Sequence, residues 1–161
     1  MTAARVLELL RASGRTLAVA ESLTGGLLVD AFVRVPGASA VLHGGVVAYA
    51  TPVKHSLLGV DAALLDAEGP VHPEVARQMA DGVRRAVAVD GRPADVGLST
   101  TGVAGPDPQG GRPPGTVFVG VAVGERILAA RGDLPGDRAA VREATVELAV
   151  ATLLRALEQP E

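Results

Sequence analysis

The sequence lacks cysteine and tryptophan, and only 2% of its 161 residues are aromatic. Without cysteine there are no disulfides, no thiolate nucleophile and no cysteine ligands for a metal. With so few aromatic residues the core must be aliphatic. The apolar runs are short and interrupted by Arg, Asp or Gly, well under the ~20 residues that a membrane-spanning helix needs.

The chain also lacks an excess of positive charge. Its net charge of -3 and pI near 5.6 give no electrostatic footprint for nucleic acid or an anionic membrane, so a small-molecule partner is expected. His43, His55 and His72 show no close pairing, so no metal site is expected. The first 15 residues carry Glu8 and no continuous apolar region, which is unlike a signal peptide. A cytoplasmic location is therefore the default expectation.

The length and composition predict one globular domain over residues 1–161. Hydrophobic residues make up 48% of the chain and charged residues 20%, and a chain of this length buries roughly 70% of its unfolded surface. No internal repeat or linker interrupts it. Residues 102–115 are rich in Gly and Pro and predict a long loop inside the domain. Long loops in compact domains are usually functional or mobile.

Hydrophobic periodicity and turn residues predict alternating helices and strands. In chain order the expected elements are a helix ending near Gly14, a strand over 16–20, a helix over 27–34, a strand within 41–50, a helix with Thr51 as N-cap and Pro52 first, a helix over 73–89, a strand over 95–101, a hairpin of 116–123 and 127–131 turning at 124–125, and a helix from N-cap Asp137 to about 157. This alternation predicts an α/β sandwich, and the hairpin predicts that its sheet is mixed.

Lysine is nearly absent too. Of 15 Lys plus Arg residues only Lys54 is lysine, and the single tyrosine, Tyr49, lies five residues before it. Arginine cannot readily lose a proton because its pKa exceeds ~12, whereas burial can bring a lysine, ordinarily near ~10.4, toward neutrality. A lone lysine in an arginine-rich chain is what a general base would look like. The alternative is a surface lysine that reflects only coding bias.

Ser22 lies in a predicted strand-turn-helix, so its hydroxyl could project above the sheet edge. The N–H groups of Thr24, Gly25 and Gly26 would then suit a phosphate or a developing oxyanion. The segment is neither Gly-x-Ser-x-Gly nor a P-loop. The alternative is that Ser22 or Thr24 is only an N-cap and that the glycines only permit close packing.

Two further features point to the same edge. The strand end 99–102, with Thr101, places hydroxyls where ligands bind in open α/β sheets, although such hydroxyls also satisfy local backbone groups. Arg138 opens the last helix and could contact a phosphate, although most single arginines are solvated surface residues.

Three segments together resemble one family: Ala-Glu-Ser-Leu-Thr-Gly-Gly at 20–26, Pro-Gly-Ala-Ser at 36–39 and Thr-Gly-Val-Ala-Gly-Pro at 101–106. They resemble the CinA C-terminal family, whose characterised members are nicotinamide mononucleotide deamidases. The resemblance extends from about residue 7 to 157. It covers only the C-terminal part of full-length CinA proteins, so no function of their extra N-terminal domain is expected here.

The resemblance implies a three-layer α/β/α sandwich with a mixed sheet and a serine amidohydrolase with a Ser/Lys pair. Ser22 would be the nucleophile and Lys54 the general base, with Tyr49 and Thr101 orienting groups or relaying protons. Leu23 departs from the cysteine often found in that turn. The substrate-binding residues implied by the family motifs are Thr24, Gly25, Gly26, Ser39, Gly105 and Arg138. Exchange of the roles of Ser22 and Ser39 remains open.

The implied reaction is hydrolysis of the carboxamide of nicotinamide mononucleotide to nicotinate mononucleotide and ammonia, in pyridine nucleotide recycling. It needs no metal or cofactor. The partners expected are a small nucleotide substrate, no nucleic acid, no membrane and, as an open question, further copies of the chain. The alternatives are a non-catalytic nucleotide-binding or regulatory module and an amidase for another phosphorylated amide.

Overall fold

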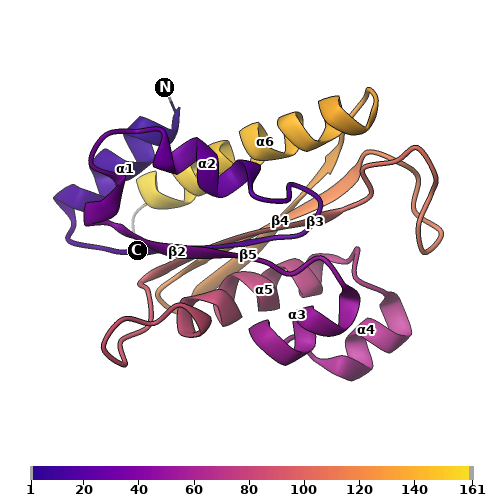
Figure 1. Cartoon of the computed structure of the whole chain (residues 1–161), viewed down its shortest axis with the longest axis horizontal. Helices are drawn as coiled ribbons and strands as arrows, with labels where there is room; N and C mark the ends of the chain where they lie inside the picture. Colours follow the sequence, from indigo (N-terminus) through magenta and orange to yellow (C-terminus); the bar gives the residue numbers. More distant parts are fainter. Residues whose placement is uncertain (1, 160–161) are drawn as a thin grey trace.

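The computed structural model describes residues 2–159 and contains a five-stranded mixed sheet between two helix layers (Figure 1). The strands are β1 (Leu17–Glu21), β2 (Leu42–Val47), β3 (Val96–Gly102), β4 (Thr116–Val123) and β5 (Arg126–Asp133), in the order β2-β1-β3-β4-β5. β1 pairs in parallel with β2 and β3, whereas β4 is antiparallel to both β3 and β5. The predicted mixed sheet is confirmed.

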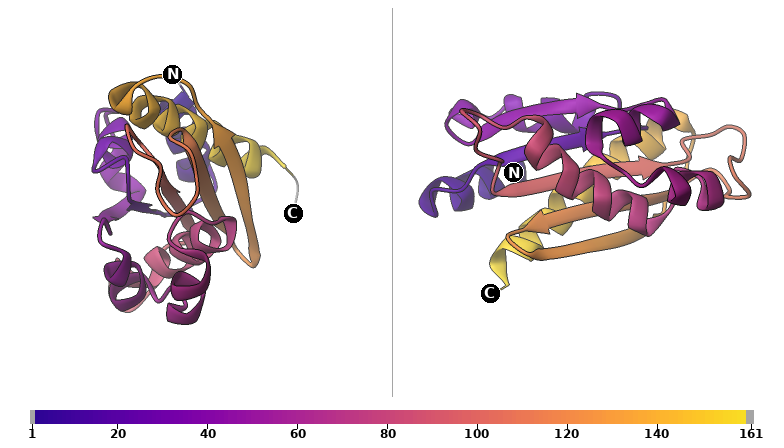
Figure 2. Two further views of the ribbon diagram at one scale, coloured as in Figure 1. Left: turned by 90° about the vertical axis from the view of Figure 1, so that its right-hand side faces the viewer. Right: turned by 90° about the horizontal axis from the view of Figure 1, so that it is seen from below.

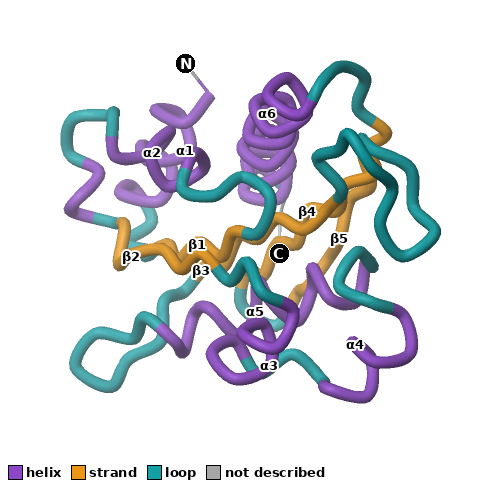
Figure 3. Tube along the Cα trace, turned by 45° about the vertical axis from the view of Figure 1, so that its right-hand side comes forward, coloured by secondary structure: helices purple, strands orange, loops and turns teal. Residues whose placement is uncertain are grey.

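Helices cover both faces of the sheet, so the predicted three-layer sandwich is confirmed. One layer contains α1 (Thr2–Ala12), α2 (Leu27–Val33) and α6 (Arg138–Glu158), and the other contains α3 (Thr51–Leu58), α4 (Ala62–Glu68) and α5 (Pro73–Ala86) (Figure 3). A 3-10 helix, η1 (Ala38–Ala40), precedes β2. Although α6 has 21 residues, no helix within residues 2–159 is long and apolar enough to cross a membrane.

The core is aliphatic apart from two buried phenylalanines, Phe32 and Phe118. One apolar cluster joins the sheet to the α1, α2 and α6 layer, and a second joins it to α3 and α5. β4 is buried along its whole length, which explains its continuous apolar sequence. Glycine lets α5 approach the sheet: a Cβ at Gly97 would lie 1.8 Å from the Ala80 carbonyl oxygen, so only glycine fits there.

The chain order of the strands creates a crevice. From β1 the chain passes through α2 to β2 on one side, then returns through α3, α4 and α5 to β3 on the other side. Connections that leave a central strand in opposite directions open a crevice at the carboxyl ends of the strands, where α/β sheets bind ligands. We call this end of the sheet the carboxyl edge. Figure 2 (left) looks onto it and shows loop 103–115 between the two helix layers.

Two local predictions were wrong, and one helix was not predicted. The N-cap of α3 is Ala50, and Thr51 is already its first helical residue. α4, capped by the Asp61 carboxylate, has only seven residues and too short an apolar pattern to be predicted. α5 ends at Ala86 rather than 89, because residues 89–92 form a tight turn closed by reciprocal backbone hydrogen bonds. The Asp137 cap of α6 is confirmed, since its carboxylate accepts from the Ala140 N–H at 2.9 Å.

Candidate active site

A cavity of about 390 Å³ opens at the carboxyl edge. Five segments line it: the turn after β1, the segment from β2 into α3, the connection from α4 to α5, the end of β3 with the loop after it, and the first residue of α6. Ser22, Lys54, Tyr49, Thr101 and Arg138 all lie on its wall. The fold thus brings together residues that are up to 116 positions apart in the sequence.

Lys54 is buried at the base of this cavity, with 1% of its surface exposed. Its Nζ lies 2.8 Å from the Ala48 carbonyl oxygen, 3.4 Å from the Tyr49 carbonyl oxygen and 3.0 Å from Ser22 Oγ. Burial lowers the pKa of Lys54 to about 8. The interpretation of Lys54 as a surface lysine is therefore wrong. A neutral amine can donate to both carbonyls and accept the Ser22 hydroxyl proton with its lone pair.

Ser22 follows the last residue of β1 and is held by its own backbone. Its N–H donates to the Thr100 carbonyl on β3 at 3.1 Å, and its carbonyl accepts from the Gly25 N–H at 3.1 Å. Its side chain is directed to Lys54, so the interpretation of Ser22 as an N-cap is wrong.

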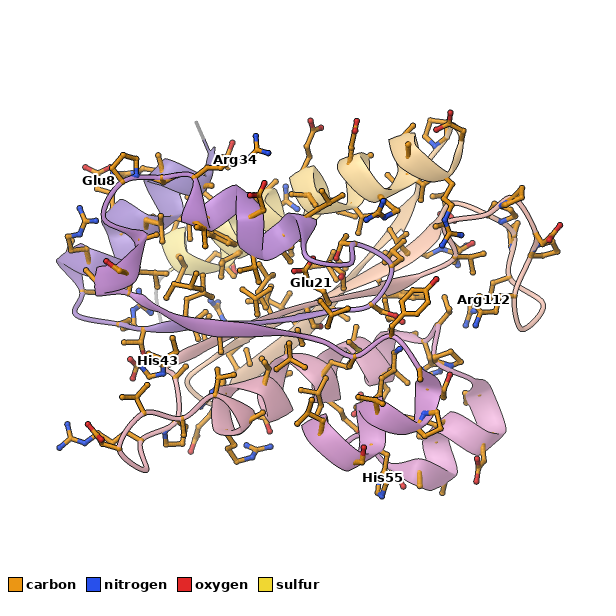
Figure 4. The ribbon with its side chains drawn as sticks, viewed as in Figure 1. Glu8, Glu21, Arg34, His43, His55 and Arg112 are labelled. Carbon is orange, nitrogen blue, oxygen red and sulfur yellow. The ribbon has the colours of Figure 1, made fainter. Side chains whose placement is uncertain are left out.

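α2 is capped by other groups. Its N-cap residue is Gly26, in a left-handed conformation with φ of 105°, so Thr24 is not the cap either. The buried carboxylate of Glu21 accepts from the N–H groups of Leu28 and Val29 at 2.8 and 3.1 Å. Figure 4 shows Glu21 between the sheet and α2. This carboxylate was not among the predicted site residues, and it fixes where α2 begins after the Ser22 turn.

The predicted anion-binding turn is only partly in place. Thr24, Gly25 and Gly26 do not line the cavity. The Gly25 N–H is already bonded to Ser22, and the Thr24 hydroxyl pairs with the Thr100 hydroxyl at 2.8 Å. Within residues 2–159 the N–H groups of Leu23 and Thr24 donate to no acceptor. Of these two residues only Leu23 lines the cavity, so its N–H is the group beside Ser22 that is free to bind an oxyanion there.

The upper wall of the cavity is a network around Arg138. Its guanidinium donates to the Tyr49 hydroxyl at 3.0 Å and to the Gly105 carbonyl at 2.6 Å. The Thr101 hydroxyl donates to the Pro70 carbonyl at 2.7 Å. This hydroxyl therefore satisfies a backbone group, which was one of the two roles considered for it from the sequence. All of these residues line the cavity, so the predicted grouping of Tyr49, Thr101, Gly105 and Arg138 with Ser22 is found.

Ser39 is not part of this site, contrary to the prediction. It is exposed, lies in η1 before β2 begins, and does not line the cavity. Because β2 runs parallel to β1, a residue before β2 lies at the opposite end of the sheet from one that follows β1. Ser39 therefore cannot exchange roles with Ser22.

Arg142 contacts the site and was missed by the sequence analysis. It lies one helical turn after Arg138 on α6, and it donates to the carbonyls of Leu23 and Thr24 at 2.8 and 3.1 Å. Spacing of four on a helix places both arginines on one face, which is a signal that the sequence contained.

Among the residues that the structure describes, no three His, Asp or Glu side chains are grouped in a way that could hold a metal ion.

Comparison with known proteins shows similarity over almost the whole chain. Residues 1–157 match the CinA C-terminal domain family. The chain is 49% identical over 152 residues to a CinA-like protein of Frankia casuarinae and 45% identical over 144 residues to one of Gemmatimonas aurantiaca. These matches cover 94% and 88% of the chain, but only 34% and 32% of the relatives, so the chain spans about a third of their length.

Solved structures show the same architecture. A CinA superfamily protein from Klebsiella pneumoniae is 30% identical, with a TM-score of 0.90 and coverage of 97% of this chain and 95% of that one. A competence/damage inducible protein from Agrobacterium tumefaciens is 31% identical, with a TM-score of 0.89 and coverage of 98% and 94%. The whole arrangement of sheet and helices is therefore shared with these proteins.

Proposed function

The chain belongs to the CinA C-terminal domain family, and we propose that it hydrolyses the carboxamide of nicotinamide mononucleotide to nicotinate mononucleotide and ammonia. The observation that carries this proposal is the 3.0 Å contact between buried Lys54 Nζ and Ser22 Oγ at the base of a cavity. A serine whose hydroxyl touches a lysine that burial brings toward neutrality is suited to nucleophilic attack on an amide. The specific substrate is taken from the resemblance to the family.

In the proposed acylation step, neutral Lys54 accepts the Ser22 hydroxyl proton while Oγ forms a bond to the amide carbon. The amide oxygen takes the negative charge and accepts a hydrogen bond from the free N–H group of Leu23, which lines the cavity. Lys54 then gives its proton to the amide nitrogen as the C–N bond breaks. Ammonia leaves and Ser22 remains as an ester of the nicotinate carboxyl group.

The second half of the cycle uses the same groups. Lys54, neutral again, takes a proton from a water molecule that attacks the ester carbon. The proton returns to Ser22 Oγ as the ester bond breaks, and the carboxylic acid so formed releases its remaining proton to solvent and leaves as a carboxylate. The carbonyls of Ala48 and Tyr49 hold the lysine nitrogen in place for both transfers.

The cavity suits a mononucleotide in size and charge. Its volume of about 390 Å³ lies within the ~300–1,000 Å³ of most small-molecule sites. Arg138, at its rim, offers a guanidinium to a phosphate, and Asp107 on the opposite loop offers a carboxylate near the positively charged pyridinium. We assign the phosphate contact to Arg138.

Ammonia release tests this proposal. The intact protein should release ammonia from nicotinamide mononucleotide, and Ser22→Ala should reduce the rate at least ~10³-fold because the covalent route is lost. Nicotinamide riboside, which lacks the phosphate, should be a poorer substrate. Absence of release by the intact protein would contradict the proposal, and binding without release would make the chain a nucleotide-binding module. Faster release from another phosphorylated amide would correct the substrate.

A further inference from the structure

We propose that Arg142 is a positioning residue: it holds the backbone of the Ser22 turn so that the Leu23 N–H beside the nucleophile is fixed for oxyanion binding. This inference rests on the proposed amide hydrolysis at Ser22. Arg142 lies on α6 behind the turn, and it is not among the residues that line the cavity. Any effect on the reaction must therefore pass through the turn itself.

Two hydrogen bonds join the guanidinium to the turn. Nε donates to the Leu23 carbonyl at 2.8 Å and Nη2 donates to the Thr24 carbonyl at 3.1 Å. Hydrogen bonds from a charged donor are stronger than those between neutral groups, and the rigid fork of arginine fixes two acceptors at once. The guanidinium is also close to Gly25, where a Cβ would lie 3.3 Å from Nη2 and where φ is +56°.

Holding these carbonyls also fixes N–H directions. In a planar trans peptide the carbonyl and the next N–H point in opposite directions. The Leu23 carbonyl faces Arg142, so the Thr24 N–H faces away from α6. The Thr24 carbonyl also faces Arg142, and the Gly25 N–H of the same peptide reaches the Ser22 carbonyl. Without Arg142 the Thr24–Gly25 peptide would keep its backbone hydrogen bonds to Ser22 and Leu27. The Leu23–Thr24 peptide would lose the hydrogen bond that holds its carbonyl and could rotate, so the adjacent Leu23 N–H would lose its alignment toward the oxyanion.

The two arginines of α6, Arg138 and Arg142, contact different parts of the site. Arg138 contacts the rim through Tyr49 and the Gly105 carbonyl, where a phosphate would bind. Arg142, four residues later, contacts only the nucleophile turn among the side-chain hydrogen bonds described. Loss of Arg138 should therefore weaken substrate binding, whereas loss of Arg142 should slow the chemical step.

The experiment compares Arg142→Ala, Arg142→Lys and the control Glu143→Ala, which removes the exposed side chain at the next position of α6. We expect kcat for ammonia release to fall about 10- to 100-fold in Arg142→Ala, because misplaced oxyanion donors cost up to about 10²-fold. KM should change less than about threefold. Arg142→Lys keeps the charge but not the fork, so it should recover part of kcat. Glu143→Ala should match the intact protein.

Two further readouts separate positioning from folding. The midpoint of the pH profile should stay near 8 in Arg142→Ala, because the pKa of Lys54 is lowered by burial. Thermal unfolding should show that the variant is folded at the assay temperature. An unchanged kcat, an effect confined to KM, or a loss of activity that merely follows unfolding would each overturn the proposal.

A serine-directed phosphonofluoridate distinguishes this proposal from the choice of substrate. Ser22 Oγ would bond to phosphorus with loss of fluoride and the hydroxyl proton, a step that also develops charge on oxygen. If the intact protein is labelled but releases no ammonia from nicotinamide mononucleotide, the proposed substrate fails, while labelling about tenfold slower in Arg142→Ala would still support the positioning role. Equal labelling rates would overturn it. If the intact protein were neither labelled nor able to release ammonia, both proposals would be overturned.

Discussion

The two ends of the sheet differ in chemistry more than in shape. At the carboxyl edge, a cavity of about 390 Å³ contains Ser22 and Lys54 in direct contact. The opposite end, which we call the amino edge, has a larger cavity of about 580 Å³ lined in part by His43, Asp90 and Asp95. Figure 4 shows His43 at the amino edge and Arg112, on the loop after β3, at the other end.

The two edges differ in whether they contain buried charged side chains. Within residues 2–159 the fully buried charged side chains are Glu21 and Lys54, and both belong to the carboxyl edge. At the amino edge the Asp95 carboxylate accepts from the backbone and hydroxyl of Thr16, an ordinary structural role. The comparison teaches that cavity volume does not identify the reactive end of this sheet. A buried ionisable group in contact with a nucleophile does.

The largest expected effect comes from removing the base at the carboxyl edge. Lys54→Met keeps an unbranched apolar side chain but no amine, so ammonia release should fall about 10²- to 10⁴-fold. His43→Ala is the matched change at the amino edge and should leave the rate unchanged. Steady-state assays of both variants measure this. A larger loss of activity in the His43 variant than in the Lys54 variant would contradict the assignment of the carboxyl edge as the reactive end of the sheet.

The same lysine predicts how activity depends on pH. Lys54 acts as a base only when neutral, and burial lowers its pKa to about 8. The rate at low substrate concentration should therefore rise about tenfold per pH unit below 8 and level off above it. A profile that falls through this range, or one that is flat, would contradict the assignment of Lys54 as the base.

The second expected effect is on stability. The fall of the Lys54 pKa from its ordinary value near 10.5 to about 8 corresponds to a change of about 3 kcal/mol in the free energy of unfolding. Between these pH values the unfolded chain binds a proton that the folded chain has released, so the free energy of unfolding should rise with pH across that window. Denaturant unfolding at pH 8 and 10.5 measures it. Lys54→Met should lack this rise; an equal rise in the variant would place its origin elsewhere.

The smallest expected effect concerns the two serines. Ser39 is exposed at the amino edge, so Ser39→Ala should change kcat less than about twofold and shift stability by less than about 0.5 kcal/mol. Kinetics of Ser39→Ala beside Ser22→Ala sharpen the comparison of the two edges. A large loss of activity in Ser39→Ala would show that a residue of the amino edge reaches the reaction.

Much of this could be predicted from local signals. The strand-turn-helix around Ser22 and the single lysine needed only composition and a short pattern, and the hairpin of β4 and β5 was expected within a few residues. Ser39 could not be placed, because the family motif that contains it does not say at which edge it lies. Arg142 is 119 residues from its partner Leu23, and no periodicity in either segment predicts that contact.

The sequence by itself determined the aliphatic core, the alternation of helices and strands, and the residue types for a Ser/Lys pair, because these depend on composition and near neighbours. Only the tertiary structure decided which of these residues meet. The strand order β2-β1-β3 places the ends of β1 and β3 beside each other, and α3 buries Lys54 against Ser22. That burial, and with it the lowered pKa of the lysine, exists only once the helix layers have closed over the sheet.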